Sequence, residues 1–437
     1  MSHWPNASDV GPVLHWPNAS DVEALATRPA GLARLAAFVP RAGAPYARTR
    51  NHDTGPQRRD NVSGLSPWIR LRLLTEREVL AAAVETHGPN ACRKFAEEVC
   101  WRTYFKGWLE LRPAVWADYR TELERLRDEL SGPGARRDAW RQALAGETGI
   151  DCFDAWVREL AETGYLHNHA RMWFASIWIF TLGLPWQLGA DLFLRQLLDG
   201  DPASNTLSWR WVAGLHPRGK TYLARRDNIR KYSGGRFDPG DRLSRAAPAV
   251  DEPPPPPAAA LTPRPPLPAG RPLALLLTED DLHPESLGLP AARVAAVGGF
   301  SAAAERAVDG TADGPVAFAR GGLEDALARA AQHFEAGTRL FEPTALEDIG
   351  AWLEGAGLTD LAVPWPPVGP ARARAADLAH GLVERGVDVW PLRRDWDDRL
   401  WPLATGGYFG FRKRGLPVAL TMAAPADGAA DDAQRSA

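Results

Sequence analysis

A proline-rich stretch divides the 437-residue chain into two parts with different hydrophobic periodicity. Residues 246–272 contain five consecutive prolines, Pro253 to Pro257, and several more further on, which predicts an extended, semi-rigid linker. Over residues 25–245, apolar residues recur at helical spacing and strand-like alternation is scarce. We therefore predict an all-helical domain before the linker.

After the linker, residues 273–423 carry short apolar runs separated by helical stretches. Residues 273–277, 294–297, 361–363 and 387–392 predict strands, and residues 323–335 and 371–385 predict helices between them. This alternation is typical of a small α/β domain with a parallel sheet. The expected fold class is thus mostly α, an all-helical domain followed by a smaller C-terminal α/β domain.

The two ends of the chain differ from both parts. The octapeptide HWPNASDV occurs twice within residues 1–24, and residues 424–437 are polar and rich in alanine. Two copies are too few for a repeat fold. We expect both ends to be poorly ordered.

Composition narrows the class of protein. Hydrophobic residues make up 45% and charged residues 24%, which suits a packed core rather than a disordered chain. The longest apolar stretch, residues 173–184, is too short to cross a bilayer, and no signal peptide is evident. The three cysteines form no disulfide or metal-ligand pattern. We expect a cytoplasmic monomer without metal or membrane association.

The net charge of −3 conceals two basic segments. Residues 210–236 contain eight Lys or Arg residues and one Asp, and residues 48–72 add further arginines. Local basic patches are suited to phosphate contacts, whereas total charge mainly affects solubility. Each segment is equally compatible with a solvated basic face.

Three polar clusters interrupt the apolar helical pattern. Glu98, Trp101 and Arg102 stand at i, i+3 and i+4, so they share one helix face and combine an acid, a stacking ring and a cation. A surface ion pair is the plain alternative. The second cluster, within YLHNHARM at residues 165–172, places four polar residues at the head of an apolar segment, where buried polar groups need partners.

The third cluster is DGDPASN at residues 199–205, after another apolar helix. Asp199 and Asp201 are two carboxylates that predict an ion pair with a cationic side chain, and Arg171 is a candidate. Metal binding is the rival interpretation, but the loop lacks the further oxygen ligands of a calcium site. Asn205 and Trp209 follow at i and i+4.

The order and spacing of these motifs resemble the FAD-binding domain of DNA photolyases and cryptochromes over residues 30–235, about half of the chain. The matching positions are Tyr46, Ser63-Gly64-Leu65-Ser66-Pro67, Glu98-x-x-Trp101-Arg102, Thr148-Gly149, His167-Asn168, Arg171-Met172, Asp199-Gly200-Asp201, Asn205 and Trp209-x-Trp211.

The resemblance implies FAD as cofactor and assigns residues to it. The implied cofactor-binding residues are Tyr46, Ser63, Leu65 and Ser66 at the phosphates and ribityl chain, and Arg102, Asn168, Arg171, Asp199, Asp201 and Asn205 around the flavin ring. An Arg171–Asp199 ion pair beside the ring is part of this expectation, and Asn205 is expected to face flavin N5.

The resemblance also implies light-driven repair of DNA that contains UV lesions, by electron transfer from reduced flavin to a pyrimidine dimer. The implied pocket for a flipped-out dimer is lined by Arg50, Glu98, Trp101, Asn168, His169, Met172 and Trp211. The expected catalytic residues are Glu98, Asn205, Trp209 and Trp186, the last two as the first members of an electron-relay chain.

Several departures favour the alternative, a cryptochrome-like blue-light receptor that signals through a protein partner without repair. Val62 replaces a common threonine of the phosphate turn, and His169 stands where dimer photolyases usually carry arginine. The third relay tryptophan has no counterpart near residues 132–134, and Trp140, Trp173 and Trp178 are the candidates to take its place. The lesion, a cyclobutane dimer or a (6-4) product, stays open.

Domain order is the largest departure, because typical family members begin with an α/β antenna domain. Here an α/β domain follows the helical one. One hypothesis is a permuted antenna-like domain with residues 404–411 (ATGGYFGF) near its functional end. The alternative is an interaction domain or a degenerate relic. No antenna chromophore is assigned.

Overall fold

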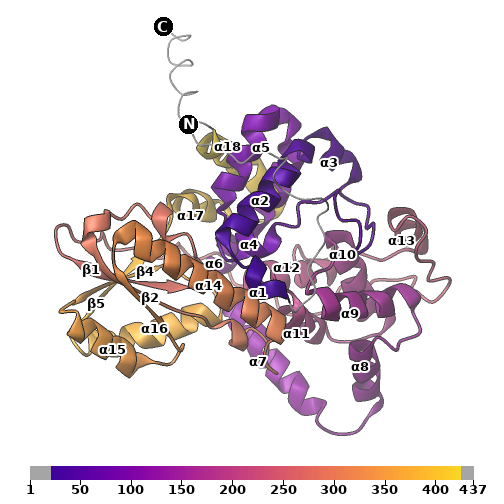
Figure 1. Ribbon diagram of the computed structural model, residues 1–437. Helices are drawn as coiled ribbons and strands as arrows, with labels where there is room; N and C mark the ends of the chain where they lie inside the picture. Colours follow the sequence, from indigo (N-terminus) through magenta and orange to yellow (C-terminus); the bar gives the residue numbers. More distant parts are fainter. Residues whose placement is uncertain (1–20, 425–437) are drawn as a thin grey trace.

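The computed structural model describes residues 21–424 of the chain. It is mostly helical and contains one five-stranded parallel sheet, which confirms the predicted fold class (Figure 1). Residues 1–20 and 425–437, expected to be poorly ordered, lie outside the described residues. Residues 22–24, also expected to be poorly ordered, instead belong to the helix Val22–Leu25, in which Val22 is 1% exposed.

The helical half precedes the linker. Its α-helices are α1 (Val22–Leu25), α2 (Arg28–Phe38), α3 (Ala44–Thr49), α4 (Ser66–Arg70), α5 (Glu76–Ala91), α6 (Arg93–Glu110), α7 (Ala114–Glu129), α8 (Ala135–Ala145), α9 (Asp151–Thr163), α10 (Asn168–Ser176), α11 (Trp186–Gln196), α12 (Pro202–Val212) and α13 (Arg226–Tyr232).

Local sequence signals explain where some of these helices begin. Thr75 caps α5, and Glu78 completes a capping box by accepting hydrogen bonds from Thr75 in return. Asp201 caps α12 by accepting a hydrogen bond from the Ser204 amide at 2.6 Å. The apolar stretch after α10 continues through a π-helical turn at Ile177–Thr181 and ends before Pro185.

The α/β part follows the linker. Its strands are β1 (Leu273–Thr278), β2 (Val294–Phe300), β3 (Gly337–Phe341), β4 (Asp360–Pro364) and β5 (Asp388–Leu392), and its helices are α14 (Asp313–Phe334), α15 (Leu346–Gly355), α16 (Pro370–Val383), α17 (Asp395–Leu400) and α18 (Tyr408–Ala423). The strands are parallel in the order β3-β2-β1-β4-β5.

Side-chain alternation along β1 explains the layers around the sheet. Leu273, Leu275 and Leu277 belong to the core shared with α14 and the helical half. Ala274 and Leu276 face the other way, into a core formed with α15 and α16. Both faces of the central strand are therefore covered, as a parallel sheet requires.

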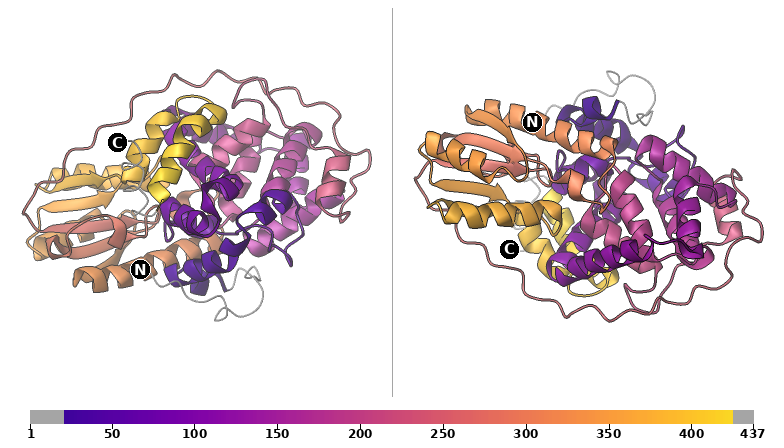
Figure 2. Two further views of the ribbon diagram at one scale, coloured as in Figure 1. Left: turned by 90° about the horizontal axis from the view of Figure 1, so that it is seen from above. Right: turned by 90° about the horizontal axis from the view of Figure 1, so that it is seen from below.

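The two halves share an extensive contact. Helix α14 packs on α1, and the C-terminal helix α18 packs on α5 and α6. Figure 2 shows α18 lying against the helical half rather than over the sheet. The last helix of the chain is thus part of the helical layer, although it follows the sheet in sequence.

Buried ion pairs fill the carboxyl end of β1. Asp280 pairs with Arg70, while Arg72 contacts Asp281 at 3.3 Å and Asp397 at 2.6 Å. Ligands of open α/β sheets commonly bind at this edge, beside the point where strand order reverses, which here lies between β1 and β4. In this chain the arginines of the helical half occupy that edge.

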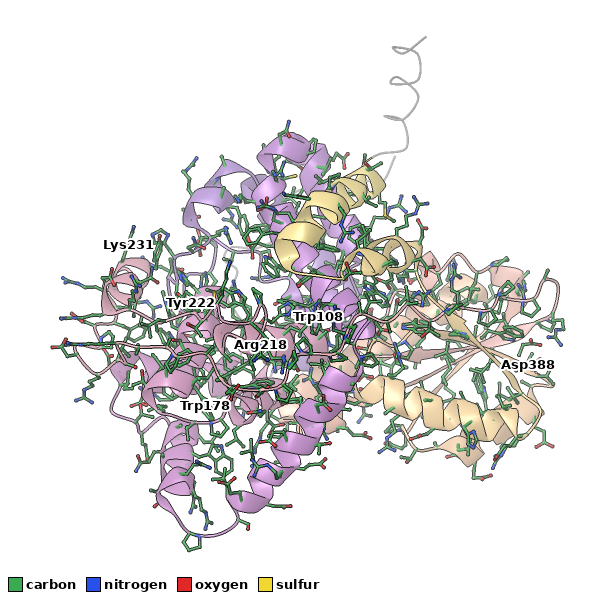
Figure 3. All side chains as sticks on the ribbon, turned by 180° about the vertical axis from the view of Figure 1, so that it is seen from behind. Trp108, Trp178, Arg218, Tyr222, Lys231 and Asp388 are labelled. Carbon is green, nitrogen blue, oxygen red and sulfur yellow. The ribbon has the colours of Figure 1, made fainter. Side chains whose placement is uncertain are left out.

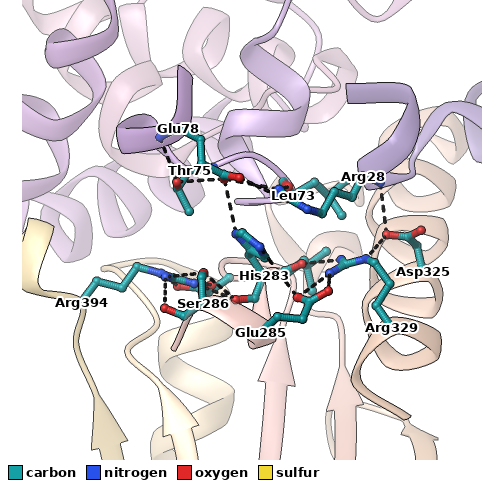
Figure 4. A network of polar contacts seen from close by, with 12 residues as sticks. Arg28, Leu73, Thr75, Glu78, His283, Glu285, Ser286, Asp325, Arg329 and Arg394 are labelled. Atoms are coloured by element: carbon teal, nitrogen blue, oxygen red, sulfur yellow. Dashed lines mark hydrogen bonds and ion pairs between the residues drawn. The ribbon is translucent and has the colours of Figure 1, made fainter. Parts of the chain in front are cut away.

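A second polar network joins the halves nearby (Figure 4). Glu78 of α5 accepts hydrogen bonds from Arg28 and lies 3.4 Å from His283 Nδ1. Arg28 also donates its backbone amide to Asp325, and Arg329 binds both Asp325 and Glu285. Because these groups belong to both halves, the network fixes their relative position.

The proline-rich segment runs along the outside of the molecule without helix or strand (Figure 2). Glu252 attaches it to the helical half by accepting hydrogen bonds from Trp186 and Gln187 and by pairing with Arg210. Within residues 21–424, every helix is too short or too polar to span a membrane.

Candidate functional site

A cavity of about 570 Å³ opens in the helical half, walled mainly by α3, α4, α6, α10 and α12. It brings together motifs that are up to 165 residues apart in sequence, from Tyr46 to Trp211. The candidate residues that line it are Tyr46, Arg50, Ser63, Leu65, Ser66, Glu98, Trp101, Arg102, Asn168, His169, Arg171, Met172, Asp199, Asp201, Asn205, Trp209 and Trp211. Trp186 is not among the lining residues.

Three ion pairs balance the charge of the lining. Arg171 Nη2 lies 3.0 Å from Asp199 Oδ2, the pairing that the sequence suggested. Arg50 Nη1 lies 2.6 Å from Glu98 Oε1, and Arg102 Nη1 lies 3.6 Å from Asp201 Oδ2. The cavity therefore offers positive and negative groups side by side without a large net charge.

Burial and these cations act on the carboxyl groups in opposite directions. Burial raises the pKa of Asp199, but Arg171 outweighs it, so this pKa is lowered on balance. Burial also raises the pKa of Asp201, but the nearby cations Lys106, Arg102 and Arg70 lower it by more, so this pKa is lowered on balance. Burial prevails at Glu98, where it raises the pKa despite Arg50.

Some polar atoms of the lining residues have no hydrogen-bond partner within residues 21–424. They are Arg102 Nη1, Asp199 Oδ1, Ser204 Oγ and Trp209 Nε1. Buried polar atoms normally have hydrogen-bond partners, so several atoms without hydrogen bonds among the lining residues of one cavity fit a ligand with both donors and acceptors.

Helix α12 presents a polar face to the cavity that sequence reasoning identified only in part. The sequence predicts Asp201 and Asn205 as site residues, but Ser204 and Ser208 also line the cavity. Helical periodicity was the available signal, because Ser204 and Ser208 are four residues apart and directly precede Asn205 and Trp209. The Asn205 amide is fixed by donating to the Ala190 carbonyl at 2.8 Å.

Aromatic rings form the remaining walls. Trp211 is partly exposed and stacks on Tyr222, with ring centroids 5.5 Å apart. Trp209 is buried and packs edge-on against Phe193 at 5.1 Å. The cavity thus has one deep aromatic side and one accessible aromatic side.

Trp186 lies elsewhere, stacked on Tyr119 with centroids 5.6 Å apart. Tyr119 in turn lies 5.2 Å from Trp116. These rings form a separate aromatic group on α7 and α11, and the role of Trp186 as the second member of an electron relay stays a prediction.

His169 replaces the arginine that the family pattern suggested. Its Nδ1 lies 2.9 Å from the Asn51 carbonyl, and its ring stacks on Trp173 at 4.3 Å. Burial lowers the pKa of His169. The side chain is therefore neutral at pH 7, so this position supplies no cation to the cavity.

The basic segments contribute fewer surface charges than their composition suggests. Arg59, Arg70 and Arg210 are buried and ion-paired, which corrects the interpretation of them as surface residues. The exposed cations of the second segment are Arg218, Lys220, Arg225, Arg226, Arg230, Lys231 and Arg236. Figure 3 shows Lys231 and Arg218 on the same side of the molecule as Tyr222, which backs the cavity residue Trp211.

Comparison with known proteins identifies this half of the chain. Residues 95–245 match the family model described as the FAD binding domain of DNA photolyase. Residues 95–245 belong to this family. FAD is the cofactor of this photolyase-type domain, and the mixed donor and acceptor groups of the cavity fit it.

Individual relatives agree with the family. A deoxyribodipyrimidine photo-lyase of Streptomyces griseus is 36% identical over 186 residues, covering 40% of this chain and 39% of the relative. One from Thermus thermophilus is 35% identical over 227 residues, half of each chain. A cryptochrome DASH of Danio rerio is 33% identical over 176 residues, 39% of this chain and 32% of the relative.

A class III photolyase structure from Agrobacterium tumefaciens has 25% sequence identity and a TM-score of 0.41, covering 52% of this chain and 46% of that one. The chain spans half or less of the length of the photolyases and cryptochromes named above. The residues matched by the family model, 95–245, lie in the helical half.

Substitution of Gly189 should disturb the deep side of the photolyase-type cavity. A Cβ at this position of α11 would lie 2.3 Å from Trp209 and 3.0 Å from Trp178. We expect Gly189→Ala to lower the free energy of unfolding by about 1–3 kcal/mol through overpacking and to reduce bound FAD, because Trp209 must shift. Chemical denaturation and the ratio of flavin to protein absorbance measure both effects.

The matched control is Gly410→Ala in α18, where a Cβ would meet no atom within 4 Å. There the higher helix propensity of alanine over glycine should apply, and the free energy of unfolding should rise by up to about 1 kcal/mol. If the two variants had the same free energy of unfolding and the same FAD content, the close approach of Gly189 to Trp209 would be unimportant.

Proposed function

We propose that this protein repairs UV-damaged DNA in a light-driven, FAD-dependent reaction that splits pyrimidine dimers. The observation that carries the proposal is the joint lining of one cavity by the cofactor-type groups around Asp199 and Asp201 and by the partly exposed rings Trp101 and Trp211. Such a cavity can hold a redox cofactor and an extruded pair of bases together.

Each set of side chains has a role in this proposal. Trp101, Trp211 and Met172 provide apolar surfaces on which the two bases lie. Glu98, oriented by Arg50, is a hydrogen-bonding group for a base edge. The exposed cations around α13 contact the phosphates that flank the lesion.

The chemistry that FAD supplies when bound is the light-driven transfer of one electron to the dimer and its return after the two linking C–C bonds break, with no net redox change. The residues around it orient rather than react. Asn205 holds its amide in place through Ala190, and the Arg171–Asp199 pair fixes two charges at the cavity wall.

The second candidate function is a blue-light receptor without repair. The observation that favours it is the neutral His169 on the cavity wall. An arginine at this position, as in dimer photolyases, would offer a cation to the DNA phosphates. A receptor would bind FAD and respond to light but would show no preference for damaged DNA.

The deciding experiment uses oligothymidine that carries cyclobutane dimers, with reductant and blue light. Repair restores the ultraviolet absorbance of thymine, and a light-independent binding assay compares damaged with undamaged strands. We expect Trp101→Ala to weaken dimer affinity by about 1–3 kcal/mol, roughly 5- to 150-fold, because one stacking surface is lost.

Trp140→Ala is the matched control, since Trp140 is a partly buried tryptophan outside the cavity that packs against Arg127. It should leave dimer affinity unchanged. Bound FAD without dimer preference in the wild-type protein would contradict repair of this lesion. The same assay with a (6-4) product then distinguishes another lesion from a receptor.

A further inference from the structure

The indole of Trp101 is stacked on a residue from the far end of the chain. The rings of Trp101 and Tyr408 have centroids 3.4 Å apart and planes inclined by 12°. Trp101 is partly exposed and lines the cavity, whereas Tyr408 is 7% exposed and is not among the lining residues. Tyr408 therefore supports Trp101 from the side away from the cavity.

Tyr408 is itself held firmly. Its hydroxyl donates to the Glu97 carbonyl of α6 at 2.5 Å, one helical turn before Trp101. Just before Tyr408, the Gly406 carbonyl accepts a hydrogen bond from Tyr104 at 2.8 Å. The start of α18 is thus attached to α6 on both sides of the stacked pair.

This attachment fixes the orientation of the indole before any substrate arrives. A partly exposed tryptophan can rotate, and ordering it on binding costs affinity. A parallel ring in contact with one face removes that freedom and leaves the other face for a base. The sequence motif at residues 404–411, expected near a functional end, is the segment that makes this contact.

We propose that Tyr408 is a positioning residue for the aromatic wall that receives the substrate base. The α/β part thereby completes the substrate pocket of the helical half through α18. This inference rests on the proposed function, because it assigns Trp101 to the base of a DNA lesion.

The test compares Tyr408→Ala, Tyr408→Phe and Tyr119→Ala in the full-length protein. Tyr119 is a matched control because it is a buried tyrosine stacked on Trp186, outside the cavity. We expect Tyr408→Ala to weaken affinity for dimer-bearing oligothymidine roughly 5- to 10-fold, because an unsupported Trp101 loses part of the affinity that one stacked base contributes. FAD content and affinity for undamaged strands should not change.

Tyr408→Phe keeps the stacked ring and should restore affinity, whereas Tyr119→Ala should leave it at the wild-type level. Unchanged dimer affinity in Tyr408→Ala would overturn the proposal. Tighter binding would also overturn it, because Tyr408 would then be blocking the wall rather than supporting it.

A second readout separates this inference from the proposed function. If the wild-type protein shows no preference for dimers, the proposed function fails, but quenching of flavin fluorescence by iodide still reports on the cavity wall. Greater quenching in Tyr408→Ala than in Tyr408→Phe would support Tyr408 as the residue that holds the wall. Equal quenching in the two variants would overturn that role.

Discussion

Asp201→Ala should lower the free energy of unfolding by about 4–6 kcal/mol. Asp201 is 3% exposed and lies 3.6–3.8 Å from nitrogen atoms of Arg70, Arg102 and Lys106. Removing one partner of a buried charge cluster costs about 3–5 kcal/mol, and the lost cap of α12 adds about 1 kcal/mol. Urea denaturation of the flavin-free protein measures the change without a contribution from cofactor binding.

Two further variants separate the causes of this loss. Asp201→Asn retains a capping oxygen and removes only the charge, so it should recover about 1 kcal/mol. Asp238→Ala removes the carboxylate of an exposed ion pair with Arg226 and should cost at most about 1 kcal/mol. If Asp238→Ala cost as much as Asp201→Ala, burial would not be the reason for the effect.

The loss in Asp201→Ala should also depend on pH. Burial lowers the pKa of Lys106, while Asp201 raises it. Without Asp201, the folded protein binds this proton less tightly still, so the unfolded chain holds more protons as the pH approaches the ordinary pKa of lysine. Stability then rises with pH, and the deficit should shrink between pH 7 and pH 9.5.

Much of the fold could be predicted because each half has its own periodicity. The helices before the linker and four of the five strands follow apolar patterns that local sequence makes visible. Strand β3 was missed because four of its five residues are exposed, so no apolar run marks it. It is an edge strand, placed by backbone pairing to β2.

The site was predictable where motifs have fixed spacing, and it was not where tertiary packing decides. Asp199 and Arg171 could be paired from sequence, since both stand at the margins of apolar helices. Nothing local indicates that Tyr408 stacks on Trp101, which is 307 residues away. Nor does composition reveal that Arg59 and Arg70 are buried, because a buried and a solvated arginine look alike in sequence.

Arg171→Met should cost about 3–5 kcal/mol of stability and reduce bound FAD at least about 10-fold. Arg171 is the ion-pair partner of Asp199, a cavity-lining residue whose side chain is 4% exposed and whose Oδ1 has no hydrogen-bond partner within residues 21–424. The substitution therefore leaves a carboxylate buried beside the cofactor. Denaturation curves and the flavin-to-protein absorbance ratio give the two quantities.

The pH dependence and a double variant show whether the pair serves the cofactor or only the fold. Without Arg171, burial is opposed only by the smaller effects of Arg102 and Ser66, so the pKa of Asp199 rises and the folded protein binds this proton more tightly. Stability then falls as pH rises, and the deficit should be larger at pH 8 than at pH 5.

Arg171→Met with Asp199→Asn removes both charges and should regain most of the stability. FAD content should stay low in this double variant, because the cavity has lost a charged donor and acceptor that the cofactor uses. Recovery of FAD content together with stability would instead assign the pair a structural role alone.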